Sequence, residues 1–397
     1  MPNPSTPLPD KSHDKSHASE PASENAAKTF GEFFAGVGLA RIGFERSGWR
    51  VAFANDLDAQ KHRMYEGHFG PSPEYRLADV HALADDPAAV PDMTLAHASF
   101  PCTDLSLAGA RRGIHAGESS AFWGFHQLLK AMGDRKPPLV LLENVTGFLT
   151  SQSGGDFHAA LTAMNELGYA VDAFVLDAAH FVPQSRPRLF VVCKQPGVRD
   201  LPAAPVEQLT ASTLRPAALV AAITKFDDLN WAIAELPEPP AYGRAKLDSV
   251  LDRLPADSPQ WWSEERAVYL YNQMSDRHRA QADAMIAGRQ WSFGTVFRRV
   301  RKGRSMAELR TDGLAGCLRT PKGGSGRQIL FQAGFGEYRV RLLNADECAR
   351  LMGASGYRMT APLNQALFGF GDAVCADAID WIAVHYLNPL ADALVSA

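Results

Sequence analysis

Reactive side chains occur in this chain directly after short apolar runs. Phe100-Pro101-Cys102 follows the run at 94–99, and Glu143-Asn144-Val145 closes the run at 138–143. A thiolate is a nucleophile, and a carboxyl group can hold or transfer a proton during a reaction. The carboxyl ends of parallel strands meet at one edge of a sheet, where ligands bind. The two motifs therefore predict an active edge, although an inert buried cysteine and a helix-capping glutamate are the alternative interpretations.

A pair of arginines precedes another apolar run. Gln184-Ser185-Arg186-Pro187-Arg188 leads into the run at 188–193. Alternate side chains of an extended segment point the same way, so we expect Arg186 and Arg188 to project together. Two guanidinium groups on one side favour recognition of an anion or a carbonyl group. A solvated charged edge is the alternative.

A glycine pattern follows the first apolar run. Phe33-Phe34-Ala35-Gly36-Val37-Gly38 leads from a predicted strand into a helical pattern, which lets backbone N–H groups approach a ligand. Asp56 ends the next run, where a carboxylate can accept hydrogen bonds from ribose hydroxyls. Arg41 occupies the place of the third glycine of the dinucleotide fingerprint. The pattern predicts a nucleoside cofactor, with a simple tight turn as the alternative.

The elements that must position these residues alternate along the chain. The expected strands are 29–34, 50–55, 94–99, 138–143, 170–176 and 188–193. The expected helices are 38–47, 58–68, 119–133 and 156–167. Strands alternating with helices predict a doubly wound α/β sheet with helices on both faces.

The remaining segments differ in composition. The first 28 residues hold five prolines, five serines and no aromatic residue, which is typical of a disordered tail. From 195 to about 338, proline clusters, paired tryptophans and a Gly/Arg-rich stretch predict a second domain of irregular content. Helical periodicity returns over 343–397 and is expected to complete the first domain.

The whole-chain composition is that of an ordinary globular protein. Hydrophobic residues make up 46% and charged residues 21% of 397 residues, a length typical of two or three domains. No apolar run approaches the roughly 18 residues that a membrane helix needs. The five cysteines include no Cys-x-x-Cys pair. We therefore expect no disulfide framework, no zinc ribbon and a reducing cytoplasm.

The net charge of −4 conceals an uneven distribution. Fourteen basic and four acidic residues lie between 277 and 341, so this segment carries +10 and the rest of the chain −14. A charged segment is usually only a solvated face. Here the interleaved Trp291, Phe293 and Phe297 and the glycine-rich turn at 323–326 favour contact with a nucleic acid.

Taken in order, these motifs resemble the cytosine-5 DNA methyltransferase family over about 29–194 and 339–397. Phe34-x-Gly36-x-Gly38 is similar to the family's S-adenosylmethionine loop, Asn55-Asp56 to its ribose-binding acid and Asp79-Val80 to its adenine-contacting pair. Arg341-Leu342-Leu343-Asn344-Ala345-Asp346-Glu347 resembles the segment before its final motif. The resemblance implies a cofactor site formed by Phe34, Gly36, Gly38, Asp56, Leu57, Asp79, Val80, Pro101, Asp372 and Val374.

The same resemblance implies the chemistry. Cys102 would attack carbon-6 of cytosine, which makes carbon-5 nucleophilic, while Glu143 bonds the ring nitrogen N3 and the exocyclic amine. Arg186 and Arg188 would hold the base carbonyl and neighbouring groups. Because the target atom is buried in a duplex, the base must flip out. The segment 103–118 resembles the family's mobile loop, which closes over the flipped base.

Two positions depart from the family pattern. Thr103 follows the nucleophile, where glutamine is common, and Gly371-Asp372-Ala373-Val374 replaces the usual Gly-Asn-x-Val. Aspartate accepts hydrogen bonds but does not donate them, as asparagine does. The cofactor contact at 372 must therefore differ in this chain.

We predict an S-adenosylmethionine-dependent DNA (cytosine-5) methyltransferase. It would have a tail (1–28), a catalytic domain (29–194), a target-recognition domain (195–338) and a C-terminal segment (339–397) that completes the catalytic domain. The side chains expected to contact DNA are Ser106, Arg111, Arg298, Arg299, Arg301, Lys302, Arg304, Arg319, Lys322 and Arg327.

Several features of its setting are also expected. We expect a cytoplasmic, nucleoid-associated monomer without a membrane or metal site, acting in restriction-modification or phage defence, with cognate restriction or defence proteins as partners. The alternatives are a tRNA cytosine-5 methyltransferase, which one branch of the family represents, and a catalytically silent DNA-binding regulator. Retention of Cys102, Glu143 and both arginines disfavours the silent regulator, because a pure binder needs no nucleophile.

Overall fold

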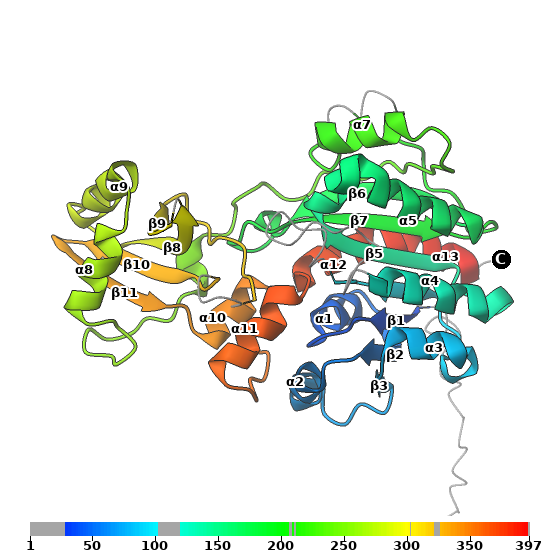
Figure 1. Cartoon of the computed structure of the whole chain (residues 1–397), viewed down its shortest axis with the longest axis horizontal. Helices are drawn as coiled ribbons and strands as arrows, with labels where there is room; N and C mark the ends of the chain where they lie inside the picture. Colours follow the sequence, from blue (N-terminus) through cyan, green and yellow to red (C-terminus); the bar gives the residue numbers. More distant parts are fainter. Residues whose placement is uncertain are drawn as a thin grey trace, which may run out of the picture.

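The computed structural model describes residues 28–101, 120–205, 209, 212–301, 303–320 and 326–395. Within them, seven strands form one large sheet in the order β3-β2-β1-β4-β5-β7-β6 (Figure 1). These strands are β1 (Thr29–Phe33), β2 (Arg50–Asp56), β3 (Tyr75–Leu77), β4 (Leu95–Ala98), β5 (Leu139–Val145), β6 (Ala170–Asp177) and β7 (Pro187–Lys194). The predicted doubly wound sheet is confirmed, with β3 added to the predicted strands.

Strand direction decides which chain ends share an edge of this sheet. Strands β1 to β5 are parallel, and β7 is antiparallel to both β5 and β6. The beginning of β7 therefore lies beside the end of β5, with Arg188 opposite Val145. The order reverses at β1, which pairs with β2 on one side and β4 on the other, and such a switch point is where open α/β sheets bind ligands.

Each face of the sheet is covered by its own group of helices. Alternate residues of β5 explain this: Val140 and Leu142 point to one face, and Leu139 and Leu141 to the other. The first face carries α3 (Val80–Asp85), α4 (Ala121–Met132), α5 (Gly155–Glu166) and α7 (Ala217–Lys225). The second carries α1 (Leu39–Arg46), α12 (Ala376–Ile382), the π-helix η7 (Ala383–Leu387) and α13 (Asn388–Val395).

The C-terminal segment packs closely against the N-terminal part of the chain. A Cβ atom at Gly43 of α1 would lie 2.5 Å from the carbonyl oxygen of Ala376 in α12, so only glycine allows this approach. Helices α2 (Ala59–Phe69), α10 (Ala345–Leu351) and α11 (Leu363–Asp372) share a third core with the residues that follow β1. The glycine turn is thereby enclosed by segments from both ends of the described chain.

A second, four-stranded sheet has the order β11-β10-β8-β9, all antiparallel (Figure 1). It consists of β8 (Ser292–Arg301), β9 (Arg304–Arg310), β10 (Ile329–Gly334) and β11 (Glu337–Leu342), with α8 (Glu264–Asn272) and α9 (Asp276–Ile286) packed on its core. The prediction of irregular content was wrong here. Arginines at 298, 299 and 301 interrupt the apolar alternation of β8 that marks a half-buried strand.

Residues beyond the expected boundary at 195 also pack on the large sheet. Leu219 and Phe226 lie in the core of the first face, and Leu214 lies in that of the second. A buried ion pair joins Arg215 to Asp172 of β6, with nitrogen–oxygen distances of 3.1 Å. The domain boundaries remain a prediction, but the core of the large sheet continues past residue 195 as far as Leu236, before α12 and the following helices rejoin it.

No helix within the described ranges is both long and apolar enough to cross a bilayer.

Candidate active site

The glycine turn after β1 has a backbone that few residue types adopt. Phe34, Gly36 and Gly38 have φ values of 59°, 57° and 78°. A Cβ at Gly38 would lie 2.5 Å from the Phe69 ring and 2.8 Å from that of Tyr65, so this position requires glycine for space as well as conformation. Phe34 adopts the left-handed region without being glycine, a strain that is typical of functional turns.

Asp56 holds this turn from the neighbouring strand. Its Oδ2 accepts a hydrogen bond from the backbone N–H of Gly36 at 2.9 Å, and its Oδ1 accepts one from that of Asp58 at 2.9 Å. A carboxylate has about four acceptor positions, so two hydroxyl groups of a ribose can still be accommodated. The next side chain, Leu57, is 68% exposed and offers an apolar surface beside the carboxylate.

The other predicted cofactor residues differ in what they offer. Asp79 caps α3, its carboxylate accepting from the backbone N–H of His81 at 2.9 Å. Val80 and Val374 are buried in the two opposite cores, so only their backbone groups can meet a ligand. Pro101 is half-buried and is the last described residue of the segment that follows β4. Asp372, half exposed, accepts a hydrogen bond from Lys61 at 3.0 Å.

Glu143 lies at the meeting point of β4, β5 and β7. It is 5% exposed, its Oε1 lies 2.9 Å from Nε of Arg188, and its Oε2 accepts a hydrogen bond from the hydroxyl of Ser99. The adjacent Asn144 donates to the carbonyl of Phe100 at 3.1 Å. This edge thus brings together Glu143, Arg188 and the backbone of Phe100, which lies two residues before Cys102.

Arg186 has surroundings different from those of Arg188. Its guanidinium is buried and donates to the carbonyls of Leu318 at 2.8 Å, Gly371 at 2.9 Å and Ala373. It therefore ties the start of β7 to the end of α11 and to the segment after β9. The catalytic role expected for Arg186 remains a prediction; three backbone carbonyls hold its guanidinium in place.

A cysteine that sequence reasoning overlooked lies beside these arginines. Sγ of Cys317 lies 3.2 Å from a terminal nitrogen of Arg186. Burial acts to raise the pKa of the Cys317 thiol, but the guanidinium groups of Arg186, Arg188 and Arg319 lower it overall. Nothing around position 317 in the sequence signals this contact. Ser99 and Lys61 were overlooked for the same reason, because single polar residues carry no spacing pattern.

Several predicted residues lie outside the described residues. These are Cys102, Ser106, Arg111, Lys302 and Lys322. Of the other expected DNA contacts, Arg298, Arg299, Arg301 and Arg304 lie on the β8–β9 hairpin, where Arg299 and Arg304 are exposed. Arg319 is also exposed, whereas Arg327 donates to the side chain of Asn364.

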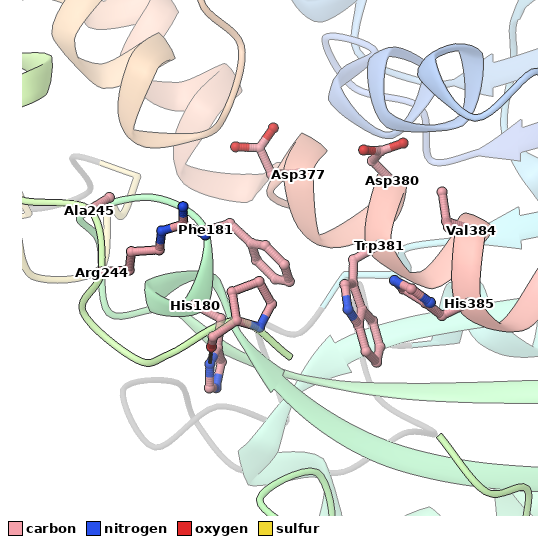
Figure 2. Close-up of a pocket in the computed structure, with 10 residues that line it drawn as sticks. His180, Phe181, Arg244, Ala245, Asp377, Asp380, Trp381, Val384 and His385 are labelled. Atoms are coloured by element: carbon pink, nitrogen blue, oxygen red, sulfur yellow. Dashed lines mark hydrogen bonds between the residues drawn. The ribbon is translucent and has the colours of Figure 1, made fainter. Parts of the chain in front are cut away.

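A hollow of about 630 Å³ lies on another part of the surface, between the loop at 240–245 and the helices α12 and η7 (Figure 2). It is lined by His180, Phe181, Pro240, Arg244, Ala245, Asp377, Asp380, Trp381, Val384 and His385. None of the residues predicted for catalysis, cofactor or DNA lines it. Its two carboxylates already have partners, Arg46 for Asp377 and Ser47 for Asp380.

A model of the family described as "C-5 cytosine-specific DNA methylase" matches residues 28–387. The chain belongs to this family. The match includes both sheets and all the described site residues, and the resemblance inferred from the motifs is confirmed.

Similar proteins include bacterial Type II methyltransferases. M.NgoBI of Neisseria gonorrhoeae is 33% identical over 162 residues, 41% of this chain and 49% of the relative. M.HaeII of Haemophilus aegyptius is 35% identical over 162 residues, 41% of this chain and 48% of the relative. The chain spans about half the length of these curated relatives in the matched regions.

Solved structures with the same fold are matched over most of their length. The S. pombe Dnmt2 methyltransferase has a TM-score of 0.59 at 16% identity, covering 91% of this chain and 99% of that one. The Entamoeba histolytica methyltransferase EhMeth has a TM-score of 0.60 at 13% identity, covering 92% and 98%. At such identities the likeness shows the fold.

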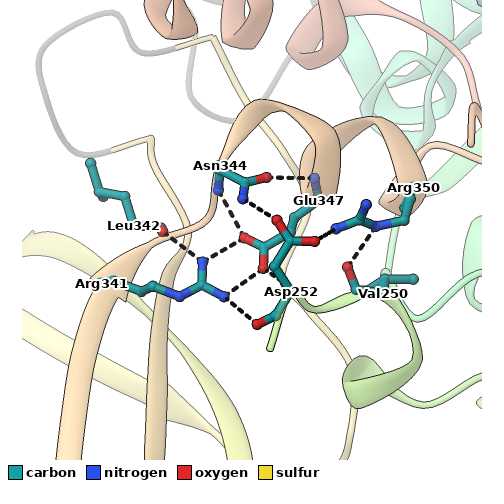
Figure 3. A network of polar contacts seen from close by, with 7 residues as sticks. All are labelled: Val250, Asp252, Arg341, Leu342, Asn344, Glu347 and Arg350. Atoms are coloured by element: carbon teal, nitrogen blue, oxygen red, sulfur yellow. Dashed lines mark hydrogen bonds and ion pairs between the residues drawn. The ribbon is translucent and has the colours of Figure 1, made fainter. Parts of the chain in front are cut away.

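In this member of the family, the segment before the final motif forms a buried polar network (Figure 3). Arg341 and Glu347 are fully buried, and the two terminal nitrogens of Arg341 donate to the two carboxylate oxygens of Glu347 at 2.6 and 2.5 Å. Asn344 and Glu347 form a capping box at the start of α10, and Asn344 also donates to Asp252 at 2.6 Å. Arg341 belongs to the basic segment 277–341, yet this burial removes it from any DNA surface.

Proposed function

We propose that this protein transfers a methyl group from S-adenosylmethionine to carbon-5 of cytosine in duplex DNA, through a covalent adduct between Cys102 and a flipped base. The observation that carries the proposal is the cluster of Glu143, Arg188 and Ser99 at the edge where Pro101 leads into Cys102. The glycine turn and Asp56 end at the same edge, on the adjacent strands β1 and β2. The acid and the proposed nucleoside site therefore lie at strand ends of one edge, and Cys102 follows β4 in the sequence, between the strands that carry them.

Cys102 supplies the electrons that carbon-5 lacks. Its thiolate adds to carbon-6 of cytosine, a carbon–sulfur bond forms, and the ring electrons move toward carbon-5 and N3. Carbon-5 would then take the methyl group while S-adenosylhomocysteine leaves. Removal of the carbon-5 proton by a base would expel the thiolate and restore the aromatic ring. Asn144 assists by fixing the carbonyl of Phe100, which sets the backbone leading to the nucleophile.

Glu143 would give a proton to N3 as the thiolate adds, which offsets the negative charge that develops on the ring. Arg188 and Ser99 each occupy one of its oxygens, so the carboxyl group is held in one orientation before the base arrives. A preorganised group costs little reorganisation during reaction. Arg188 lies at hydrogen-bond distance from this carboxylate, which supports a role for it in holding the base carbonyl.

The glycine turn and its surroundings suit an adenosyl amino acid. Backbone N–H groups at the start of α1 can meet its carboxylate, Asp56 its ribose hydroxyls, and the exposed Leu57 its adenine ring. Phe34, Gly36, Gly38 and Asp79 complete the proposed cradle. When bound, S-adenosylmethionine supplies an electrophilic methyl group.

The exposed arginines of the β8–β9 hairpin support DNA as the partner. Arg299 and Arg304 belong to the +10 segment, whereas the rest of the chain carries −14. Because the phosphate backbone provides most of the electrostatic affinity for DNA, a concentrated basic surface can bind it despite an acidic average. We propose that Arg298, Arg299, Arg301, Lys302, Arg304, Arg319, Lys322 and Arg327, together with Ser106 and Arg111, contact the DNA.

The test is transfer of tritiated methyl groups to duplex DNA or tRNA by wild-type protein and by Cys102→Ser. We expect label in DNA from the wild type, none above background from Cys102→Ser, and DNA binding by both. Label in tRNA alone would favour the tRNA enzyme, and label in neither would favour a DNA-binding regulator. Turnover by folded Cys102→Ser would contradict the covalent mechanism.

We further propose a restriction-modification role for a cytoplasmic, nucleoid-associated monomer. The support is that the bacterial relatives are named Type II methyltransferases. Bisulfite sequencing of DNA from cells expressing the protein would give the target sequence. A single short methylated motif supports the proposal, and methylation without sequence preference contradicts it.

A further inference from the structure

A lysine–carboxylate pair lies across the glycine turn. Nζ of Lys61, in the first turn of α2, donates to Oδ2 of Asp372, the last residue of α11, at 3.0 Å. Cδ of Lys61 is 3.9 Å from the position that a Cβ on Gly36 would take. The stem of the lysine therefore runs over the glycine turn, and its ammonium reaches the residue that departs from the family pattern.

The surroundings keep this lysine charged. Burial acts to lower the pKa of Lys61, but attraction from Asp372, Asp56 and Asp58 raises it overall. The side chain is 20% exposed and that of Asp372 is 51% exposed, so both border solvent rather than the core. An ammonium has three protons to donate, and the contact with Asp372 uses one.

The Lys61 ammonium and the Asp372 carboxylate lie 3.0 Å apart, so together they complement a ligand group that carries one negative and one positive charge. The amino-acid end of S-adenosylmethionine carries one ammonium and one carboxylate. We propose that Lys61 binds this carboxylate and that Asp372 binds the adjacent ammonium. The inference rests on the proposed function and assigns the role of the usual asparagine to two side chains, because the lysine supplies the donor that an aspartate lacks.

If the Lys61–Asp372 pair only held α2 against α11, breaking it would weaken the binding of every ligand equally. If the pair contacts the amino-acid end, breaking it would weaken only the binding of ligands that have this end. Calorimetric titration with S-adenosylhomocysteine and with 5′-methylthioadenosine, which lacks that end, separates the two. We expect Lys61→Met to weaken S-adenosylhomocysteine binding about tenfold, as for the loss of one charge-assisted hydrogen bond. Binding of 5′-methylthioadenosine should remain within about twofold of wild type.

Lys28 provides a matched control. It forms an ion pair with Asp392 at 2.8 Å, with side chains 19% and 63% exposed, and it too joins the two ends of the described chain. It precedes β1 and so lies at the amino end of that strand, away from the turn. Lys28→Met should therefore leave both affinities unchanged.

Asp372→Ala, which removes the carboxylate without restoring the family's usual asparagine, gives a second test that leaves α2 intact. It should also weaken S-adenosylhomocysteine while sparing 5′-methylthioadenosine, because the ligand's ammonium loses its carboxylate partner. Equal losses for both ligands, or none for S-adenosylhomocysteine, would overturn the inference and leave the proposed function standing. Failure of the wild type to bind either ligand would overturn both.

Discussion

At the scale of single residues, the polar groups of the site are held before any ligand is present. Glu143 has a partner on each oxygen, and Asp56 accepts a backbone N–H on each of its own. Preorganisation of this kind lets a side chain act without first being reoriented. It also means that conservative substitutions should alter chemistry more than folding.

Glu143→Gln is the sharpest case. Glutamine retains the size of the side chain and can still accept from Arg188, but its amide cannot transfer a proton to N3 as a carboxyl group can. We expect kcat to fall by roughly 100-fold or more, in the range of general acid–base contributions. Single-turnover transfer with DNA and thermal unfolding would be measured together. An unchanged rate in a folded variant would remove Glu143 from the mechanism.

Glu32 gives a pH dependence of stability. Burial, opposed in part by Arg41, raises the pKa of this carboxyl in β1 from 4.5 to about 8. Between pH 4.5 and about pH 8 the unfolded chain has lost this proton, whereas the folded protein keeps it. The contribution of Glu32 to the free energy of unfolding is therefore complete below pH 4.5 and declines as the pH rises to about 8. Glu32→Gln, which stays neutral, should exceed wild type in stability at pH 8 by a few kcal/mol and match it near pH 5, since one pKa unit is worth about 1.4 kcal/mol.

Urea unfolding at both pH values measures this difference. Glu166→Gln, at an exposed position of α5, is the control and should show no such pH dependence. The same offset at both pH values would mean that Glu32 remains ionised in the folded protein.

At the scale of elements, Arg186 connects three segments that are distant in sequence. Its contacts with Leu318, Gly371 and Ala373 join β7 to the end of α11 and to the segment after β9. We expect Arg186→Met to lower the free energy of unfolding by about 3 kcal/mol, because buried carbonyls lose a charged donor. Arg319→Met, at an exposed neighbouring position, should change it by less than about 0.5 kcal/mol. Equal effects would show that Arg186 contributes no more than a surface residue.

The large sheet could be predicted from the sequence because its strands are short apolar runs. The strand β3, only three residues with two exposed, gave no such signal. The strand β8 was overlooked because Arg298, Arg299 and Arg301 interrupt its apolar alternation. The site was predicted where motifs end strands, as at Glu143, but not where a lone side chain meets it through tertiary contact, as do Ser99, Lys61 and Cys317.

At the scale of the whole molecule, the basic hairpin and the proposed catalytic residues belong to different sheets. The basic hairpin belongs to the second sheet, whereas the acids of the site belong to the first. A triple variant, Arg298→Gln, Arg299→Gln and Arg304→Gln, should weaken DNA binding and reduce the slope of log affinity against log salt by about two to three, since each phosphate contact contributes about 0.9. Fluorescence anisotropy at several salt concentrations measures the slope.

A charge-matched control uses exposed basic residues from segments that pack on the large sheet. The triple variant of Lys130, Arg135 and Arg199 to glutamine removes the same charge elsewhere and should leave the slope nearly unchanged. Equal slopes in the two triple variants would indicate a general effect of net charge rather than a DNA surface on the hairpin.

The arrangement of the second face of the large sheet also has a consequence for synthesis. The last strand of this sheet in chain order, β7, ends at Lys194. Helix α12, which covers much of the second face, begins only at Ala376. At 5–20 residues per second, the roughly 180 intervening residues take about 10 to 40 seconds to translate. During that interval Phe174, Phe190 and Leu141 lack the helix that later buries them. The nascent chain therefore exposes an apolar surface, which chaperones and other nascent copies can bind, until α12 has left the ribosome.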